Sequence, residues 1–163
     1  MASWKERVKK HHEWAHQDDG YHLVTRPSVS LVQIKEVETA LGFQFPKEVR
    51  EFYLEVDGFG VKHEGREEVD WFVVPLDKVE ETTKQARDWF QETHPYAAKG
   101  FFAFIDWSCG DYTGYLVSEA PREEVFVTFS HELYEFNPEQ DPNEFIEVSY
   151  DSFEEMLDEQ ARP

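Results

Sequence analysis

The chain has 163 residues and a mass of 19.3 kDa, a length that suits one domain with its own hydrophobic core. Its formal net charge of -19 and sequence pI near 4.6 oppose binding to nucleic acid or to an anionic membrane, because both are negatively charged. The single cysteine, Cys109, excludes an internal disulfide, and the chain has no long apolar run or apolar signal core, so a cytoplasmic protein without a membrane partner is expected.

The N-terminal stretch predicts an amphipathic helix. Trp4, Val8 and Ala15 recur at helical spacing, with charged residues between them. The helix is expected to end near residues 18–20, where two aspartates precede a glycine.

This predicted helix contains the pattern HEWAH, which matches the HExxH motif of zinc peptidases. On a helix, His12 and His16 would share one face and Glu13 could act as a base. However, no sheet precedes the motif to hold a substrate, and the next histidine, His22, has no recognisable third-ligand spacing. A zinc peptidase is therefore a remote alternative, and adventitious zinc or nickel binding by the histidine pair is the better-supported reading.

The segment 30–60 predicts two short helices in close succession. Ser30 and Gln33 have the spacing of a capping box. The apolar side of the first helix consists of Ile34, Val37 and Leu41, and the opposite side consists of Lys35, Glu36 and Glu38. Gly42 can end this helix in the left-handed conformation, and Pro46 is expected at the first position of the next helix. The apolar face of the second helix consists of Val49, Phe52, Tyr53 and Val56, and Gly58 closes it.

Two motifs in this segment, LGFQFP and FYLEVDG, resemble the Smi1/Knr4 or SUKH superfamily. The common form there is LGxxLP followed by FYxxxNG, so this chain departs from it at Phe45 and Asp57. Phe45 keeps an apolar side chain before the proline, and aspartate also tolerates the turn. The residues that carry the resemblance are Leu41, Gly42, Pro46, Phe52, Tyr53, Asp57 and Gly58. The resemblance implies one SUKH domain over 1–163, with a family core at 28–158 and an N-terminal helical extension at 1–26.

The remaining chain predicts one α+β domain. A charged loop is expected at 62–68 and a strand at 69–74. A helix started by Asp77 and Glu80 is expected to end at Pro95. Further strands are expected at 101–105, 112–117, 125–129 and 145–148, and a last helix after Asp151 or Ser152, whose SFEEML resembles the SFEEFL ending common in the family. Short connections predict a mainly antiparallel sheet covered by N-terminal, middle and C-terminal helices.

Neither catalysis nor a cofactor is expected. Cys109 with His131 could form a nucleophile and base, but residues 100–121 contain no lysine or arginine to lower the pKa of a catalytic thiol. The acids and the histidine at Asp106, Asp111, His131 and Glu132 match no metal-binding loop, and setting turns is the simpler role.

Aromatic residues near these acids are the candidates for binding a partner, because exposed aromatic anchors with a polar rim are typical of protein interfaces. The candidates are Trp71, Asp106, Trp107, Asp111, Tyr112, Tyr115, His131 and Glu132. Trp107 and Tyr112 flank a turn and are expected to be the most exposed. The alternative is that most of these aromatic side chains belong to the core.

Charge and resemblance together suggest a function. Residues 131–160 contain eleven acidic residues and no lysine or arginine, which predicts either a solvated acidic face or a surface for a basic partner. The resemblance implies an immunity protein, an antitoxin that neutralises a cognate bacterial toxin domain such as a nuclease by stoichiometric occlusion, without enzymatic activity. The alternative is a regulatory or scaffold module, as implied by fungal members that carry the domain within longer chains.

Overall fold

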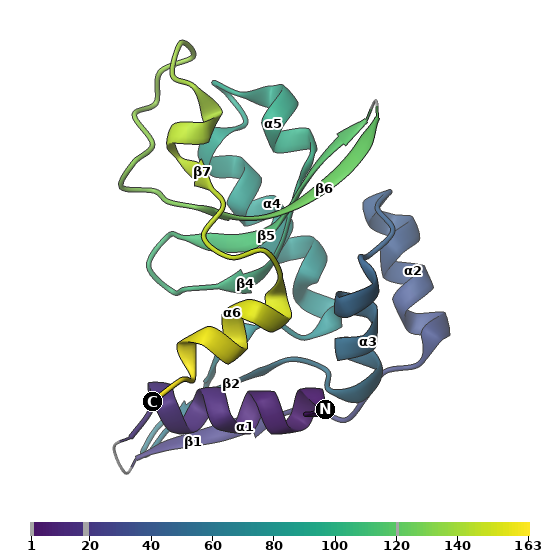
Figure 1. Ribbon diagram of the computed structural model, residues 1–163, viewed down its shortest axis with the longest axis vertical. Coiled ribbons are helices and arrows are strands. Elements are labelled where there is room, and N and C mark those ends of the chain that lie inside the picture. The colour runs from purple at the N-terminus through teal and green to yellow at the C-terminus, as the bar shows by residue number, and fades with distance from the viewer. Residues whose placement is uncertain (1, 18–19, 120) are drawn as a thin grey trace. The chain divides into compact units, whose positions relative to one another are not determined.

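The computed structural model describes residues 2–17, 20–119 and 121–163 (Figure 1). The chain forms two compact units. The first comprises residues 1–77 and 152–163, and the second comprises residues 78–151.

The helices of the first unit are α1 (Trp4–Ala15), α2 (Leu31–Leu41), α3 (Lys47–Glu55) and α6 (Phe153–Gln160). Serine side chains cap α1, α2 and α6, whereas α3 begins after Pro46 without a side-chain cap. Ser30 and Gln33 form the predicted capping box, and the Ser152 hydroxyl caps α6 by accepting from the Glu155 N–H. Gly42 ends α2 with a φ of 67°, in the left-handed region.

Aromatic side chains from three helices form the core of the first unit. Trp4 of α1 stacks on Phe153 of α6 with ring centroids 5.1 Å apart, and its ring meets Phe52 of α3 edge-on at 5.7 Å. Figure 1 shows α1 and α6 side by side in this unit. Glu48 of α3 accepts a hydrogen bond from the Phe153 N–H at 2.8 Å, which satisfies a free donor at the start of α6.

Three antiparallel strands complete the first unit in the order β1 (Tyr21–Thr25), β2 (Phe59–His63) and β3 (Val69–Val73). The predicted strand at 69–74 is confirmed as β3, whereas β1 and β2 are not predicted from the sequence. The predicted loop at 62–68 is wrong for Lys62 and His63, which belong to β2. Glycine is uncommon within strands, so Gly60 makes β2 hard to predict from the sequence. Glycine is nevertheless required at this position, because a Cβ would collide with the carbonyl oxygen of Asp70.

Three further details of the predicted helices are wrong. Glu38 is buried rather than solvent-facing, because its carboxylate accepts from the Phe45 N–H at 2.6 Å and from Arg50 at 2.9 Å. Pro46 is the N-cap of α3, one residue before the predicted position. Helix α1 ends at Ala15, short of the predicted end at 18–20, of which Asp18 and Asp19 lie outside the described residues.

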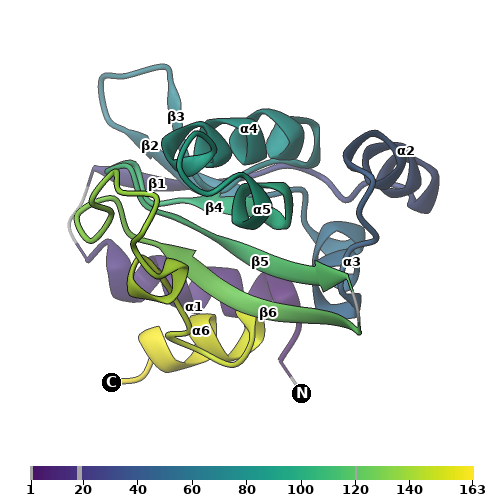
Figure 2. The ribbon, with the colours of Figure 1, turned by 90° about the horizontal axis from the view of Figure 1, so that it is seen from above.

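The second unit packs two helices on antiparallel strands. The strands lie in the order β4 (Phe101–Asp106), β5 (Tyr112–Glu119), β6 (Arg122–Phe129) and β7 (Ile146–Glu147). Helices α4 (Val79–Phe90) and α5 (Pro95–Lys99) lie on the same face of β4, β5 and β6 (Figure 2). Short 3-10 turns, η1 (Leu76–Lys78) and η2 (Pro142–Glu144), precede α4 and β7.

Large apolar side chains fill the space between these helices and strands. Phe90 of α4 stacks on Phe129 of β6 with ring centroids 5.0 Å apart, and both side chains are fully buried. The core consists of Ala86, Phe90, Ala98, Phe101, Ala103, Tyr112, Val127, Phe129, Phe145 and Ile146. Such packing fixes the ends of the strands, from which the loops project.

The predicted fold class, α+β with mainly antiparallel strands, is confirmed. Two predicted helix boundaries in this part are wrong. Asp77 does not cap α4, because its carboxylate pairs with Arg26 at 3.1 Å and the helix starts after Lys78. Helix α4 ends at Phe90, and Pro95 instead opens α5 at its first position, where a missing N–H costs no helical hydrogen bond.

Candidate functional site

The loop at 107–111 joins β4 to β5 and is folded by its own polar groups. Asp106 Oδ1 accepts from the Ser108 N–H at 2.8 Å, and the Trp107 N–H donates to the Asp111 carbonyl at 3.2 Å. Ser108 and Gly110 have positive φ values of 62° and 99°. The aspartate turn and the glycine therefore give this loop a defined shape.

The Trp107 side chain is anchored at the base of the loop. Its indole N–H donates to Thr113 Oγ1 at 2.8 Å, and Thr113 Oγ1 lies 2.7 Å from Thr128 Oγ1 of the neighbouring strand. The tryptophan is partly buried as a result. Its ring presents one part to the protein and another to solvent.

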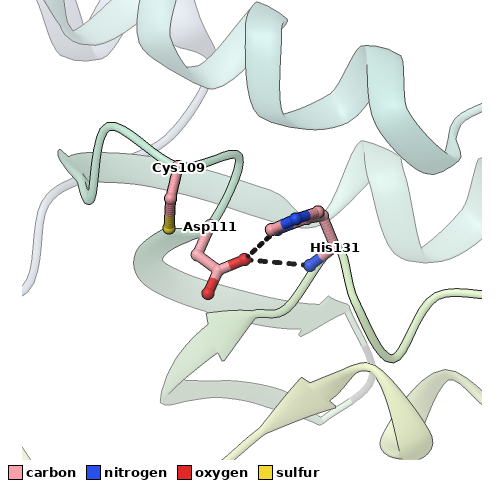
Figure 3. A group of neighbouring side chains, drawn as sticks. All are labelled: Cys109, Asp111 and His131. Atoms are coloured by element: carbon pink, nitrogen blue, oxygen red, sulfur yellow. Dashed lines mark hydrogen bonds and ion pairs between the residues drawn. The ribbon is translucent and has the colours of Figure 1, made fainter.

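Asp111 and His131 tie the loop to the segment after β6 (Figure 3). Asp111 Oδ1 accepts from the His131 backbone N–H at 3.0 Å and lies 2.6 Å from His131 Nδ1. The imidazole also contacts the ring of Trp89 on α4, with centroids 5.6 Å apart. A Cβ on Gly110 would lie 3.1 Å from the imidazole Cγ, so glycine permits this close approach.

Gln140 holds the segment 130–141 in shape through hydrogen bonds. Its side chain is buried and donates to the Leu133 carbonyl at 2.8 Å, while its amide oxygen accepts from the Glu135 N–H at 2.9 Å. The backbone carbonyl oxygen of Gln140 lies 2.7 Å from His94 Nε2. These bonds give an irregular segment a fixed backbone, and the Tyr134 ring packs against the core of the second unit.

The structure brings together only part of the predicted binding set. Asp106, Trp107, Asp111, His131 and Glu132 lie on or beside the two connected segments. Trp71 belongs to β3 in the first unit, where the Arg26 guanidinium lies over its ring at 5.1 Å.

Tyr112 and Tyr115 do not extend this surface. Their exposed fractions are 8% and 6%, so the expected exposure of Tyr112 is wrong. Tyr112 packs in the core of the second unit, and Tyr115 stacks on Phe104 with centroids 5.9 Å apart. Burial, with a smaller contribution from Asp106, raises the pKa of the Tyr112 phenol.

Three exposed apolar side chains were missed by the sequence reasoning. Trp89, Leu133 and Phe136 are 40%, 44% and 60% exposed. Leu133 and Phe136 lie among acidic residues, in a stretch without lysine or arginine. This mixture of apolar and acidic residues is the sequence signal that could have identified them as exposed. We call the set of Trp89, Trp107, His131, Glu132, Leu133 and Phe136 the loop surface.

Metal-ligating side chains also meet at this loop. Cys109 is exposed, and one ligand atom each from Cys109, Asp111 and His131 lie within 4.8 Å of one another. The His12 and His16 rings are 5.3 Å apart, but His16 follows the end of α1 and no third ligand joins the pair among residues 2–17, 20–119 and 121–163.

The LGFQFP and FYLEVDG motifs hold the first unit together. Phe52 and Tyr53 are fully buried, and the Tyr53 hydroxyl donates to the Val74 carbonyl at 2.7 Å. Asp57 Oδ1 accepts from the Leu76 N–H at 2.7 Å, and burial raises the pKa of the Asp57 carboxyl. Gly58 has a φ of 82°. The motif residues thus stabilise the fold of the first unit.

Comparison with known proteins agrees with this motif. The model of the SMI1 / KNR4 family (SUKH-1) matches residues 28–159, a stretch that includes residues of both units. A search of curated proteins finds no match. Among the helices of the described residues, none has both the length and the apolar character needed to cross a membrane. Because the family model covers most of its length, the chain belongs to the SMI1/KNR4 family (SUKH-1).

Proposed function

We propose that this protein is an immunity protein that binds a cognate bacterial toxin domain and neutralises it by covering its active site. The partner would carry a basic surface, as nucleases that bind nucleic acid do. The protein would act stoichiometrically in the cytoplasm and would not turn over a substrate.

The observation that carries this proposal is the loop surface in a chain of the SUKH family. Its exposed aromatic side chains stand beside acids, and the stretch 131–160 has eleven acidic residues without a single cation. An interface of this kind can supply apolar anchors and an acidic rim for a basic partner. Family membership supports the same reading, since the resemblance implies a module for protein interaction.

The backbone of the loop surface is held before any partner arrives. Asp111 joins the loop to His131, and Gln140 closes the following segment. A preorganised surface loses less conformational entropy on binding, which favours tight complexes. Complementary charge would speed association and make its rate fall as ionic strength rises.

Co-expression with the toxin domain encoded beside its gene tests the proposal. The wild-type chain should restore growth, whereas the double variant Glu132→Lys with Phe136→Ala should fail to do so. The matched control is Glu123→Lys, which makes the same charge change at the opposite end of the β5–β6 hairpin, where Glu123 pairs with Ser118. Both variants must first show the wild-type melting temperature.

Growth rescue by the double variant equal to that of the wild type would refute the assignment of the loop surface. Failure of the wild type to rescue, together with failure to bind the toxin domain, would refute the immunity function itself. A regulatory scaffold would give that second result.

A further inference from the structure

We propose that Cys109, Asp111 and His131 form a binding site for Zn²⁺, with three protein ligands and a fourth position open to water. This inference does not rest on the immunity function. It rests on three side chains of metal-ligating type that come from the β4–β5 loop and from the segment after β6.

The ligand atoms are already near their required places. One from each side chain lies within 4.8 Å of the others, and Figure 3 shows the three side chains facing a common space. Zinc bond lengths of about 2.0–2.3 Å in a tetrahedron place ligand atoms roughly 3.3–3.8 Å apart. Closing the gap needs a shift of about 1 Å, and Cys109 can move that far because its side chain is exposed.

The remaining two ligands are held in position by their surroundings. Asp111 Oδ1 accepts from the His131 backbone N–H at 3.0 Å, and this bond can persist when the carboxylate binds an ion. The ring of Trp89 packs against the imidazole, and Gly110 leaves room for it. Asp111 Oδ1 lies 2.6 Å from His131 Nδ1, so these two atoms must move apart by about 0.7 Å to reach the ligand spacing of a tetrahedral zinc ion.

The donor set selects the class of metal. A thiolate, an imidazole and a carboxylate together suit Zn²⁺ and its spectroscopic substitute Co²⁺, whereas Mg²⁺ and Ca²⁺ prefer oxygen ligands alone. Charge favours any cation here, because neither 100–121 nor 131–160 contains lysine or arginine. Since the metal must displace protons from the thiol and the imidazole, its affinity should rise with pH.

Cobalt absorption tests the site directly, because Cys109 is the sole cysteine of the chain. Titration of the purified metal-free protein with Co²⁺ should give a thiolate-to-cobalt charge-transfer band that saturates at one equivalent. The band should vanish in Cys109→Ser and persist in Glu132→Gln, a matched control that removes a neighbouring acid outside the ligand set. His12→Gln combined with His16→Gln should also keep the band.

Zinc affinity, measured by competition with a chromophoric chelator, gives the second readout. Cys109→Ser should weaken Zn²⁺ binding by more than about tenfold, because the thiolate is a strong ligand for this ion. Zn²⁺ should raise the melting temperature of the wild type but not that of Cys109→Ser. Equal affinities in the two proteins, or a cobalt complex without thiolate absorption, would overturn the proposal. The serine variant keeps the loop backbone, so its unchanged melting temperature without metal verifies the comparison.

Discussion

Replacing Glu38 with alanine tests how the helix pair of the family motif is joined. The Glu38 carboxylate accepts from the Phe45 N–H at 2.6 Å, just after α2, and from Arg50 of α3 at 2.9 Å. Its side chain is only 10% exposed. One buried carboxylate therefore connects the first helix, the link and the second helix.

The cost of this substitution follows from the groups that lose their partner. A buried backbone N–H left unsatisfied costs about 1–3 kcal/mol. Loss of the ion pair adds about 1 kcal/mol, a discounted value because the Arg50 side chain is 28% exposed. We expect Glu38→Ala to lower the free energy of unfolding by about 3 kcal/mol, which corresponds to roughly 6–12 °C in melting temperature for a chain of this size.

Urea denaturation followed by circular dichroism measures this change, with Glu36→Ala as the matched control on the same helix. Glu36 is exposed, so its substitution should change the free energy of unfolding by less than about 0.5 kcal/mol. Glu36 is an informative control because the sequence alone places both glutamates on the same side of the helix. Equal free energies of unfolding for the two variants would refute the reasoning.

Two further predictions concern buried titratable groups and stability against pH. Burial raises the pKa of Asp57 from its ordinary value of 3.8, so the ionised carboxyl destabilises the fold as pH rises through the raised value. Asp57→Asn keeps an acceptor for the Leu76 N–H. Its free energy of unfolding relative to that of the wild type should therefore increase as pH rises from 3.8 through the raised pKa of Asp57. Burial lowers the pKa of His11 from 6.5, so wild-type stability should fall as pH drops below 6.5 through the lowered value. His11→Gln should reduce that loss.

Urea denaturation at a series of pH values measures both effects. Asp57→Ala is the control for the first, because it removes the charge and also the acceptor, leaving the Leu76 N–H unpaired at a cost of about 1–3 kcal/mol. Parallel stability curves for Asp57→Asn and wild type would contradict the first prediction. For the second, His22→Gln at an exposed position is the control, and an unchanged acid loss in His11→Gln would contradict it.

Local signals in the sequence account for most of the fold. Caps such as Ser30 and Ser152, and apolar spacing such as that around Phe52, depend on neighbours within one or two helical turns, which the sequence displays. The burial of Glu38 could not be predicted in this way, because it depends on Arg50 from another helix. Strand β2 could not be predicted because Gly60 disfavours a strand when the sequence is considered alone. The need for glycine there becomes clear only from the close approach of the β3 backbone.

The candidate site was predictable in its location and less so in its members. The turn at 107–111 and the acidic stretch after residue 130 are visible in the sequence. The burial of Tyr112 follows from its place in the second core, and the exposure of Trp89 follows from its position on α4. Both depend on tertiary packing. The meeting of Cys109 with His131 depends on how β6 returns beside β5, and no spacing rule contains that information.

Calorimetric titration of the purified protein with the toxin domain encoded beside its gene tests the central claim most directly. The proposed function predicts one molecule bound per toxin domain, with tight affinity in the wild type and in Glu123→Lys. It also predicts at least about tenfold weaker binding in Glu132→Lys with Phe136→Ala, because exposed aromatic anchors and their acidic neighbours dominate such interfaces. Absence of binding by the wild-type protein would contradict the account.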